Sequence, residues 1–317
     1  MVNNNNNTLK SVTIIYSPFH VGLRGVGPGA GPSFLRQWPY PSRPHPGGLP
    51  ATLTTLGVTV REIELDVSDD FDGDIGRSFA LLRQTSKIVT QELDNGSFPI
   101  ILAGNCTASV GVAAGICAAA AFKSDDIGCI WFDAHDDFNT PDTIMSGYFD
   151  SMPIAMLAGQ CWKGLLATMP GYRPLDLGKL VHVGMRDVTD VERQRVVEAG
   201  FDVVWGSTEE KVDYVGELGR VLDRKQLGPA MIHIDLDCLG VSLGMVNKFS
   251  APGGLLDGEL TESLRSIVRL TKPASLTVAS FDPTFEEAEE IADIAVEAIK
   301  TFVSELVSAG VLSADQQ

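Results

Sequence analysis

Short apolar segments rich in β-branched residues alternate with helical patterns along the chain. We expect eight strands, at Val12–Tyr16, Val58–Leu65, Pro99–Ala103, Ile127–Phe132, Leu180–Gly184, Phe201–Trp205, Ala230–Leu236 and Ser275–Phe281. Between many of them lie helical patterns, at Phe79–Leu93, Ala108–Ala121, Thr189–Ala199, Glu209–Leu222, Leu260–Leu270 and Glu286–Val307. Such alternation predicts a three-layer α/β/α fold with a central, mainly parallel eight-stranded sheet.

The domain boundaries follow from length and composition. A chain of 317 residues with 44% hydrophobic content can bury one large core. We expect a single domain over residues 11–312, a disordered polar head over residues 1–10 that contains Asn3–Asn7, and a short tail over residues 313–317. The stretch Gly22–Pro50 is rich in Gly and Pro, so we interpret it as a long loop without regular helix. It lacks the spacing of the common phosphate-binding loops.

Charge and cysteine content narrow the function classes. A formal net charge of −17 repels nucleic acid and anionic membrane surfaces but suits a cationic or zwitterionic small molecule. Five cysteines, mostly within apolar stretches, favour reduced thiols over a disulfide framework. The N-terminus has no apolar secretion segment, and no apolar run approaches the ~18 residues of a membrane span. We therefore expect a cytoplasmic protein.

Acidic and imidazole side chains follow two of the expected strands at every second position. Asp133, His135 and Asp137 stand in WFDAHDD, and Asp235 and Asp237 stand in IHIDLD. Alternate residues of extended backbone face the same way, and parallel strands end at one edge of a sheet. Each aspartate alone could simply cap a helix or close a turn. Together the two clusters predict a two-metal site, for which carboxylates and one imidazole favour Mn²⁺.

These motifs resemble the ureohydrolases, the family of arginase, agmatinase and formiminoglutamase. DAHDDFNTPDTIMSG resembles the family's first metal-binding stretch, and IDLD followed by APGG resembles the second. PSFLRQ, GNCTAS and VGMRDV also fall in family order. The resemblance implies an arginase-like fold and two Mn²⁺ ions bridged by Asp133 and Asp235. Asp137 would bind the first ion and orient the attacking hydroxide, while His135 and Asp237 would complete the second site.

The sequence departs from the family at the remaining ligand. The family has a histidine where this chain has Cys106, in which respect it is similar to the hydroxyarginine-hydrolysing type. We expect Cys106 to be a ligand or a close neighbour of the metal. A helix N-terminus would lower the pKa of its thiol and favour ligation, although sulfur suits Mn²⁺ poorly. An ordinary buried thiol is the alternative.

The resemblance also implies catalytic and substrate-binding positions. Asp150 stands where the family has an acid/base histidine; it could shuttle protons or be a surface turn carboxylate. Ser280 stands where a glutamate grips the guanidinium. Asn139 and Ser146 occupy positions that resemble the family's contacts to the substrate α-carboxylate, and Glu192 resembles its contact to the α-ammonium group. The alternative for Asn139 and Ser146 is that they are simple turn residues. Thr189 and Tyr148 differ from the family in the same pocket.

The other histidines and the aromatic residues receive plainer interpretations. His20 follows a strand and could reach the site, whereas His182 and His233 lie within strand patterns and are expected to be core residues with satisfied hydrogen bonds. His45 is expected to be exposed. Trp131, Phe132 and Phe281 are expected to pack against the sheet.

The expected function is hydrolysis of a C–N bond in a guanidino or hydroxyguanidino amino acid, with Nω-hydroxyarginine first and arginine next. Two alternatives remain open: a metal-poor binding protein of the same fold, and a hydrolase of a non-guanidine amidine or formimino substrate. The family resemblance also implies a homo-oligomer.

Overall fold

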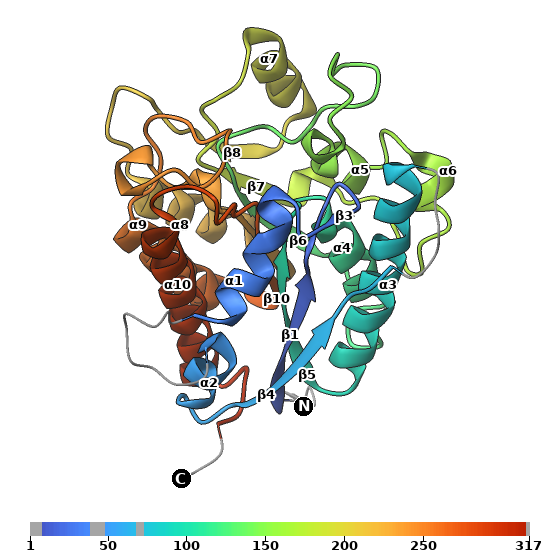
Figure 1. Ribbon diagram of the computed structural model, residues 1–317, viewed down its shortest axis with the longest axis vertical. Helices are drawn as coiled ribbons and strands as arrows, with labels where there is room; N and C mark the ends of the chain where they lie inside the picture. Colours follow the sequence, from blue (N-terminus) through green and yellow to red (C-terminus); the bar gives the residue numbers. More distant parts are fainter. Residues whose placement is uncertain (1–7, 39–47, 68–72, 315–317) are drawn as a thin grey trace.

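The eight expected strands form one sheet in the computed structural model, which describes residues 8–38, 48–67 and 73–314 (Figure 1). The sheet order is β4-β1-β5-β10-β9-β6-β7-β8, and every neighbouring pair is parallel. The strands are β1 (Ser11–Ser17), β4 (Thr59–Glu64), β5 (Ser97–Ala103), β6 (Gly128–Phe132), β7 (Leu180–Val183), β8 (Asp202–Val204), β9 (Pro229–Asp235) and β10 (Lys272–Ala279). The predicted parallel sheet is confirmed.

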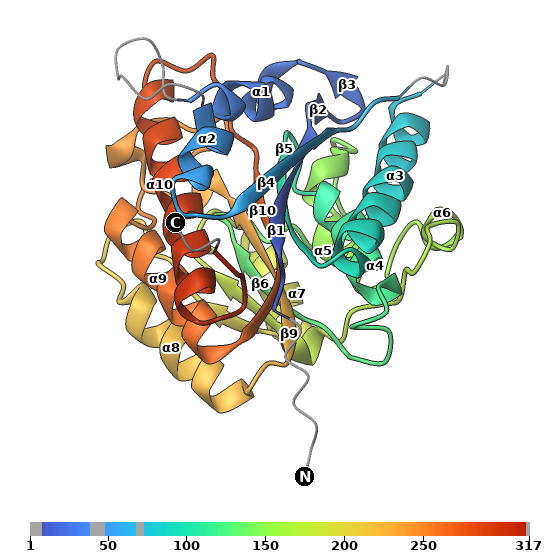
Figure 2. The same cartoon turned by 90° about the horizontal axis from the view of Figure 1, so that it is seen from below.

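Helices cover both faces of this sheet, as predicted (Figure 2). One hydrophobic core receives residues of α1 (Gly31–Arg36), α2 (Gly48–Thr54), α8 (Tyr214–Lys225), α9 (Asp257–Leu270) and α10 (Ala288–Ser308). The core on the other face receives residues of α3 (Asp74–Asp94), α4 (Ala108–Ala118), α5 (Pro153–Leu157), α6 (Lys163–Leu166) and α7 (Asp190–Ala199). All six predicted helices are present. Helix α8 begins later than expected because the Asp213 side chain caps it, accepting from the Gly216 amide at 2.9 Å.

The interpretation of Gly22–Pro50 as a loop without helix is wrong. After a short hairpin of β2 (Phe19–His20) and β3 (Leu23–Arg24), the chain forms a 3-10 turn at Gly27–Ala30 and helix α1, and α2 begins at Gly48. Pro32 is tolerated because it lies in the first turn of α1, where its missing N–H is not needed. Gly31 serves close packing, since a Cβ there would lie 2.3 Å from the Phe281 carbonyl oxygen.

Substitution of Gly31 by alanine tests this close approach. The added methyl would force α1 away from the backbone that follows β10, so we expect a loss of about 1–3 kcal/mol in the free energy of unfolding. Gly219, within α8, is the matched control, because its Cβ would meet no atom within 4 Å. We expect Gly219→Ala to be neutral or to stabilise by up to ~1 kcal/mol. Urea unfolding measures both, and equal stability of the two variants would contradict the packing role.

The ends of the domain lie slightly beyond the expected boundaries. Leu9, assigned above to the head, donates from its amide to Val311 and accepts from the amide of Ser313, which had been assigned to the tail. The structured part therefore extends outward at both ends, where Leu312 is buried. His45 lies outside the described residues. Within the described ranges, no helix is both long and apolar enough to cross a membrane.

All five cysteines are buried and free of disulfide bonds, as their apolar surroundings predicted.

Candidate active site

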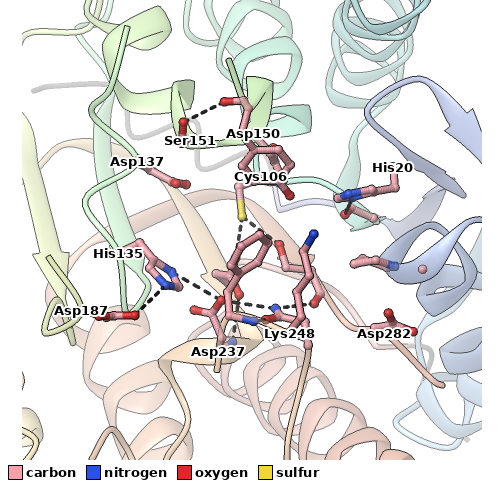
Figure 3. Close-up of a pocket in the computed structure, with 18 of the residues that line it drawn as sticks. His20, Cys106, His135, Asp137, Asp150, Ser151, Asp187, Asp237, Lys248 and Asp282 are labelled. Atoms are coloured by element: carbon pink, nitrogen blue, oxygen red, sulfur yellow. Dashed lines mark hydrogen bonds and ion pairs between the residues drawn. The ribbon is translucent and has the colours of Figure 1, made fainter. Parts of the chain in front are cut away.

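The carboxyl ends of the central strands surround one cavity of about 660 Å³ (Figure 3). Its lining includes His20 at the end of β2, Cys106 after β5, His135 after β6, Asp235 at the end of β9 and Ser280 after β10. Among the described residues, eight carboxyl groups line this cavity, from Asp136, Asp137, Asp150, Asp187, Glu192, Asp235, Asp237 and Asp282, while Lys248 is the single lysine or arginine. Such an excess of carboxyl groups, several of them buried, favours a cationic occupant.

Two groups of possible metal ligands meet beneath this cavity, and Asp133 belongs to both. In the first group, His135 Nδ1 lies 3.2 Å from Asp133 Oδ1 and 3.5 Å from Asp237 Oδ2. Cys106, Asp133 and His233 form the second group, whose ligand atoms all lie within 4.8 Å of one another. A carboxylate shared by two adjacent groups is the arrangement that a pair of bridged divalent ions requires.

The pKa values in the first group follow from burial and from each residue's neighbours. Burial raises the pKa of Asp237 to about 6. Burial alone would lower the pKa of His135, but the carboxylates of Asp237 and Asp133 raise it well above its usual value. Divalent ions bound here would replace the imidazole proton as the partner of these carboxylates.

Cys106 lies deep in the site, at the start of the turn that leads into α4. Its thiol donates to Asp235 Oδ2 at 2.8 Å and lies 3.1 Å from Ser280 Oγ. The expected lowering of its pKa by the helix N-terminus is wrong. Burial and the carboxylates of Asp235, Asp150, Asp137 and Asp133 instead raise the pKa of the thiol well above its usual value. Cys106 is therefore a protonated thiol unless a metal displaces the proton.

Asp137 reaches the cavity but belongs to neither of the two ligand groups found in the described residues. It adopts a left-handed backbone with φ of 47°. Burial, and then the carboxylates of Asp133, Asp150 and Asp235, raise its pKa well above the usual range. Its buried Oδ2 has no hydrogen-bond partner within the described ranges. An orphaned carboxylate oxygen among other carboxylates fits a divalent cation, and so do the oxygen and nitrogen donors around Asp133.

Asp150 is buried, with only 6% of its surface exposed, so the interpretation as a surface turn carboxylate is wrong. Its Oδ1 accepts from the Thr107 amide at 2.8 Å and from the Thr107 hydroxyl, and its Oδ2 accepts from the Cys106 amide at 3.2 Å. These contacts fix the turn that carries Cys106. The role of Asp150 in proton transfer stays a prediction.

Ser280 also contacts the Cys106 turn from the end of β10. It has a left-handed φ of 66°, and its carbonyl accepts from the Asn247 side chain at 2.9 Å. No charged group stands at this position, so Ser280 can offer a substrate only its hydroxyl and backbone.

The residues expected to contact an amino-acid substrate lie together on the cavity wall. Asn139 donates to Glu192 Oε1 at 3.0 Å and accepts from Arg195 at 2.8 Å. Glu192 also forms a capping box with Thr189 at the start of α7. Although burial alone would raise the pKa of Glu192, hydrogen bonds from Asn139 and Thr189 hold it below its usual value. Ser146 is exposed on the same wall.

The expectation for the core histidines is partly wrong. His182 and His233 are fully buried as predicted, but both ring nitrogens of His182 and Nε2 of His233 lack a hydrogen-bond partner among the described residues. The sequence offered a signal for His233, because it stands two residues before Asp235 on the same strand and so faces the same side. His20 lines the cavity as expected, with its ring centroid 6.0 Å from that of Tyr148.

Trp131, Phe132 and Phe281 are buried against the sheet as predicted. Trp131 does more than pack, since its indole N–H donates to Asp133 Oδ2 at 3.1 Å and its ring stacks on His233.

Two further residues of the site were missed. Asp136 is buried beside the expected ligands, and burial raises its pKa to about 6. Arg186, just after β7, donates to six backbone carbonyls, which belong to Gly184, Asp237, Cys238, Leu239, Ala251 and Pro252. It thereby joins the segment that carries Asp237 to the APGG loop. Both stand within motifs quoted above, WFDAHDD and VGMRDV, but neither occupies the alternating positions that identified the expected ligands.

Comparisons with known proteins agree with this architecture. A model described as the arginase family matches residues 10–304. The arginase of Bacillus subtilis is 25% identical over 309 residues, covering 93% of this chain and 98% of that protein. Its crystal structure has a TM-score of 0.78 at 23% identity, with the same coverage. Entamoeba histolytica arginase in complex with L-ornithine has a TM-score of 0.78 at 20% identity, covering 93% and 99%. Proclavaminate amidino hydrolase of Streptomyces clavuligerus has a TM-score of 0.67 at 18% identity, covering 96% and 93%.

Proposed function

Since the chain belongs to the arginase family, we propose that it is a metal-dependent hydrolase that cleaves a C–N bond of a guanidino or hydroxyguanidino amino acid. One observation carries the proposal: two groups of side chains that could hold metal share Asp133 beneath a cavity to which the described residues contribute eight carboxyl groups. The family relationship favours Mn²⁺, and the oxygen donors and imidazole of Asp133, His135 and Asp237 suit this ion.

The chain would hold two divalent ions through Asp133, Asp235, Asp137, His135 and Asp237, with Cys106 beside them. When bound, the ions supply a water that loses its proton near neutral pH, and they stabilise negative charge on the group under attack. The buried Asp137 Oδ2, which has no partner among the described residues, would be free to accept a hydrogen bond from that water and so orient it. Asp150, which the Cys106 and Thr107 amides hold in place, exchanges protons with the leaving group.

The cavity wall supports an amino-acid substrate. Glu192 is held ionised by its hydrogen bonds and would bind an α-ammonium group, while Asn139 and Ser146 would contact the α-carboxylate. The arginase bound to L-ornithine shows that a relative of this fold accepts an α-amino acid. A guanidinium group would then extend toward the acidic floor of the cavity.

Ser280 supports the choice of a hydroxyguanidine. A carboxylate at the end of β10 would bind a fully charged guanidinium, whereas Ser280 offers a hydroxyl next to Cys106. A hydroxyguanidine is less basic than a guanidine and carries an additional hydroxyl that such a group can bind. Nω-Hydroxyarginine is therefore our preferred substrate, and arginine is the next.

A panel of guanidino compounds incubated with metal-loaded protein tests the proposal. We expect release of hydroxyurea from Nω-hydroxyarginine, and a lower rate of urea release from arginine. Chelator-treated protein is the control and should release neither. Release of ammonia or formamide from a formimino or amidine substrate would identify the alternative reaction. A stable protein that binds no metal and turns over no compound would contradict the enzyme and support the metal-poor binding protein.

We also expect the protein to form a homo-oligomer, as the family relationship suggests, and light scattering of the purified protein measures this.

A further inference from the structure

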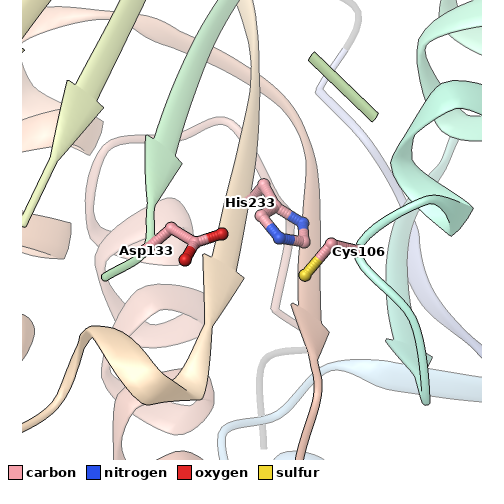
Figure 4. Close-up of side chains that lie close together, drawn as sticks. All are labelled: Cys106, Asp133 and His233. Atoms are coloured by element: carbon pink, nitrogen blue, oxygen red, sulfur yellow. The ribbon is translucent and has the colours of Figure 1, made fainter. Parts of the chain in front are cut away.

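His233 lies directly beneath the site, on β9 two residues before Asp235 (Figure 4). It is fully buried, and its ring stacks on that of Trp131 with centroids 3.7 Å apart. Nδ1 lies 2.8 Å from Ser109 Oγ in α4, while Nε2 has no partner in the part of the chain that the structure describes. An unpaired buried N–H is rarer than an unpaired acceptor, so the hydrogen belongs on Nδ1 and the lone pair on Nε2. That tautomer can bind a metal through Nε2.

His233 lies close to two other side chains that can bind a metal, the thiol of Cys106 and the carboxylate of Asp133. Its ring nitrogen, Cys106 Sγ and an Asp133 carboxylate oxygen all lie within 4.8 Å of one another (Figure 4). Two ligands on opposite sides of one ion can be at most about 4.3 Å apart, given metal bonds of about 2.0 Å to nitrogen and 2.3 Å to sulfur. Small side-chain movements therefore bring all three onto one ion. Asp235, 2.8 Å from Cys106 Sγ, is positioned to be a fourth ligand.

We propose that Cys106, His233 and Asp133 form a thiolate, imidazole and carboxylate position that selects Zn²⁺ or Co²⁺ over Mn²⁺. Thiolate and imidazole ligands favour these ions, whereas Mn²⁺ prefers oxygen. The proton on the Cys106 thiol leaves to solvent when the ion binds. The neighbouring position of Asp133, His135 and Asp237 lacks sulfur and remains suited to Mn²⁺. The inference rests on the proposed function only in assuming that divalent ions occupy this site. The two positions would then hold different ions, Zn²⁺ or Co²⁺ in one and Mn²⁺ in the other.

Cobalt spectroscopy tests this assignment without relying on activity. Co²⁺ bound to a thiolate gives a near-ultraviolet charge-transfer band, so we expect the band when chelator-treated protein is titrated with Co²⁺. Cys106→Ser should abolish it. His233→Asn keeps a polar group near Ser109 but removes Nε2, and it should weaken Co²⁺ binding at this position by more than about tenfold.

His182 provides the matched control. It is also fully buried, with both ring nitrogens unpartnered among the described residues, but it belongs to neither ligand group there. His182→Asn should leave the band and the Co²⁺ affinity within about twofold of wild type. Equal Co²⁺ affinity in His233→Asn and wild type, or equal weakening in both asparagine variants, would overturn the proposal.

X-ray absorption of wild-type protein with one equivalent of Zn²⁺ covers the case in which a variant fails to fold. We expect sulfur and imidazole around the zinc, and a shell of oxygen alone would refute the assignment. The two proposals can fail separately. A cobalt band that depends on His233, in a protein that hydrolyses no guanidino compound, would leave only the proposed function refuted. Hydrolysis without such a band would leave only the metal assignment refuted.

Discussion

Replacing Asp235 with asparagine should abolish hydrolysis and lower the affinity for divalent ions by more than about 100-fold. Loss of an outer hydrogen-bond partner of a metal ligand already costs about 10–100-fold, and Asp235 is an expected bridging ligand. Its carboxylate accepts from the Cys106 thiol and from the Asp237 amide, so it connects both ligand groups. Asparagine keeps the size and the acceptor oxygen but not the charge. Metal titration and product release measure both effects.

The fold should survive this substitution. Burial raises the pKa of Asp235 well above its usual range, which means that the ionised carboxylate is unfavourable in the metal-free protein. A neutral amide removes that cost, so the metal-free variant should unfold at the same temperature as the metal-free wild type or higher. Asp282→Asn is the control, because Asp282 lines the same cavity but its Oδ1 accepts from the Thr284 amide and hydroxyl. It should retain its metal content; full metal content in Asp235→Asn would refute the assigned site.

Replacing Arg186 with lysine should lower the free energy of unfolding by about 2–4 kcal/mol. It should also lower the affinity for a divalent ion at Asp237. The guanidinium donates to six carbonyls, including that of Asp237 at 3.0 Å. An ammonium group has three donors on a single atom and cannot span them, so several carbonyls lose their partner. Addition of Mn²⁺ should therefore raise the melting temperature less in Arg186→Lys than in wild type.

Arg220→Lys provides the comparison for this prediction. Arg220 is exposed on α8 and pairs only with Asp213 and Glu217 among the contacts described, so its replacement should change stability by less than about 0.5 kcal/mol. If both arginine variants unfold alike and respond alike to Mn²⁺, Arg186 has no positioning role.

Local periodicity was sufficient to predict the sheet, because most of its strands are short runs of buried residues and the long helices follow regular patterns after strands. It failed at α1, where composition suggested a loop. Gly31 and Pro32 oppose a helix when considered alone, but the first has no room for a side chain beside Phe281 and the second lies where no N–H is needed. Both reasons depend on tertiary packing and are invisible in the sequence.

The candidate site could also be predicted only in part from the local sequence. Asp133, His135, Asp235 and Asp237 could be predicted because they alternate just past two strands, and the structure brings them together. The same alternation extends back to His233 within β9, but a position inside a strand suggested a core residue instead.

Contacts between distant segments could not be predicted. Asp150 holds the amides of a turn that is 43 and 44 residues away in the chain, and Arg186 reaches carbonyls as far as 66 residues away. Nothing in the local sequence connects these partners. The pKa of the Cys106 thiol could not be predicted either. Burial and four carboxylates from distant segments raise it, whereas the helix start alone would lower it.

Anomalous diffraction from crystals grown with Co²⁺ tests the central claim most directly, since this ion accepts oxygen, nitrogen and sulfur ligands alike. We expect two adjacent peaks that share the Asp133 carboxylate, one beside His135 and Asp237 and the other beside Cys106 and His233. A single ion, or none, in a protein that still hydrolyses its substrate would contradict the account.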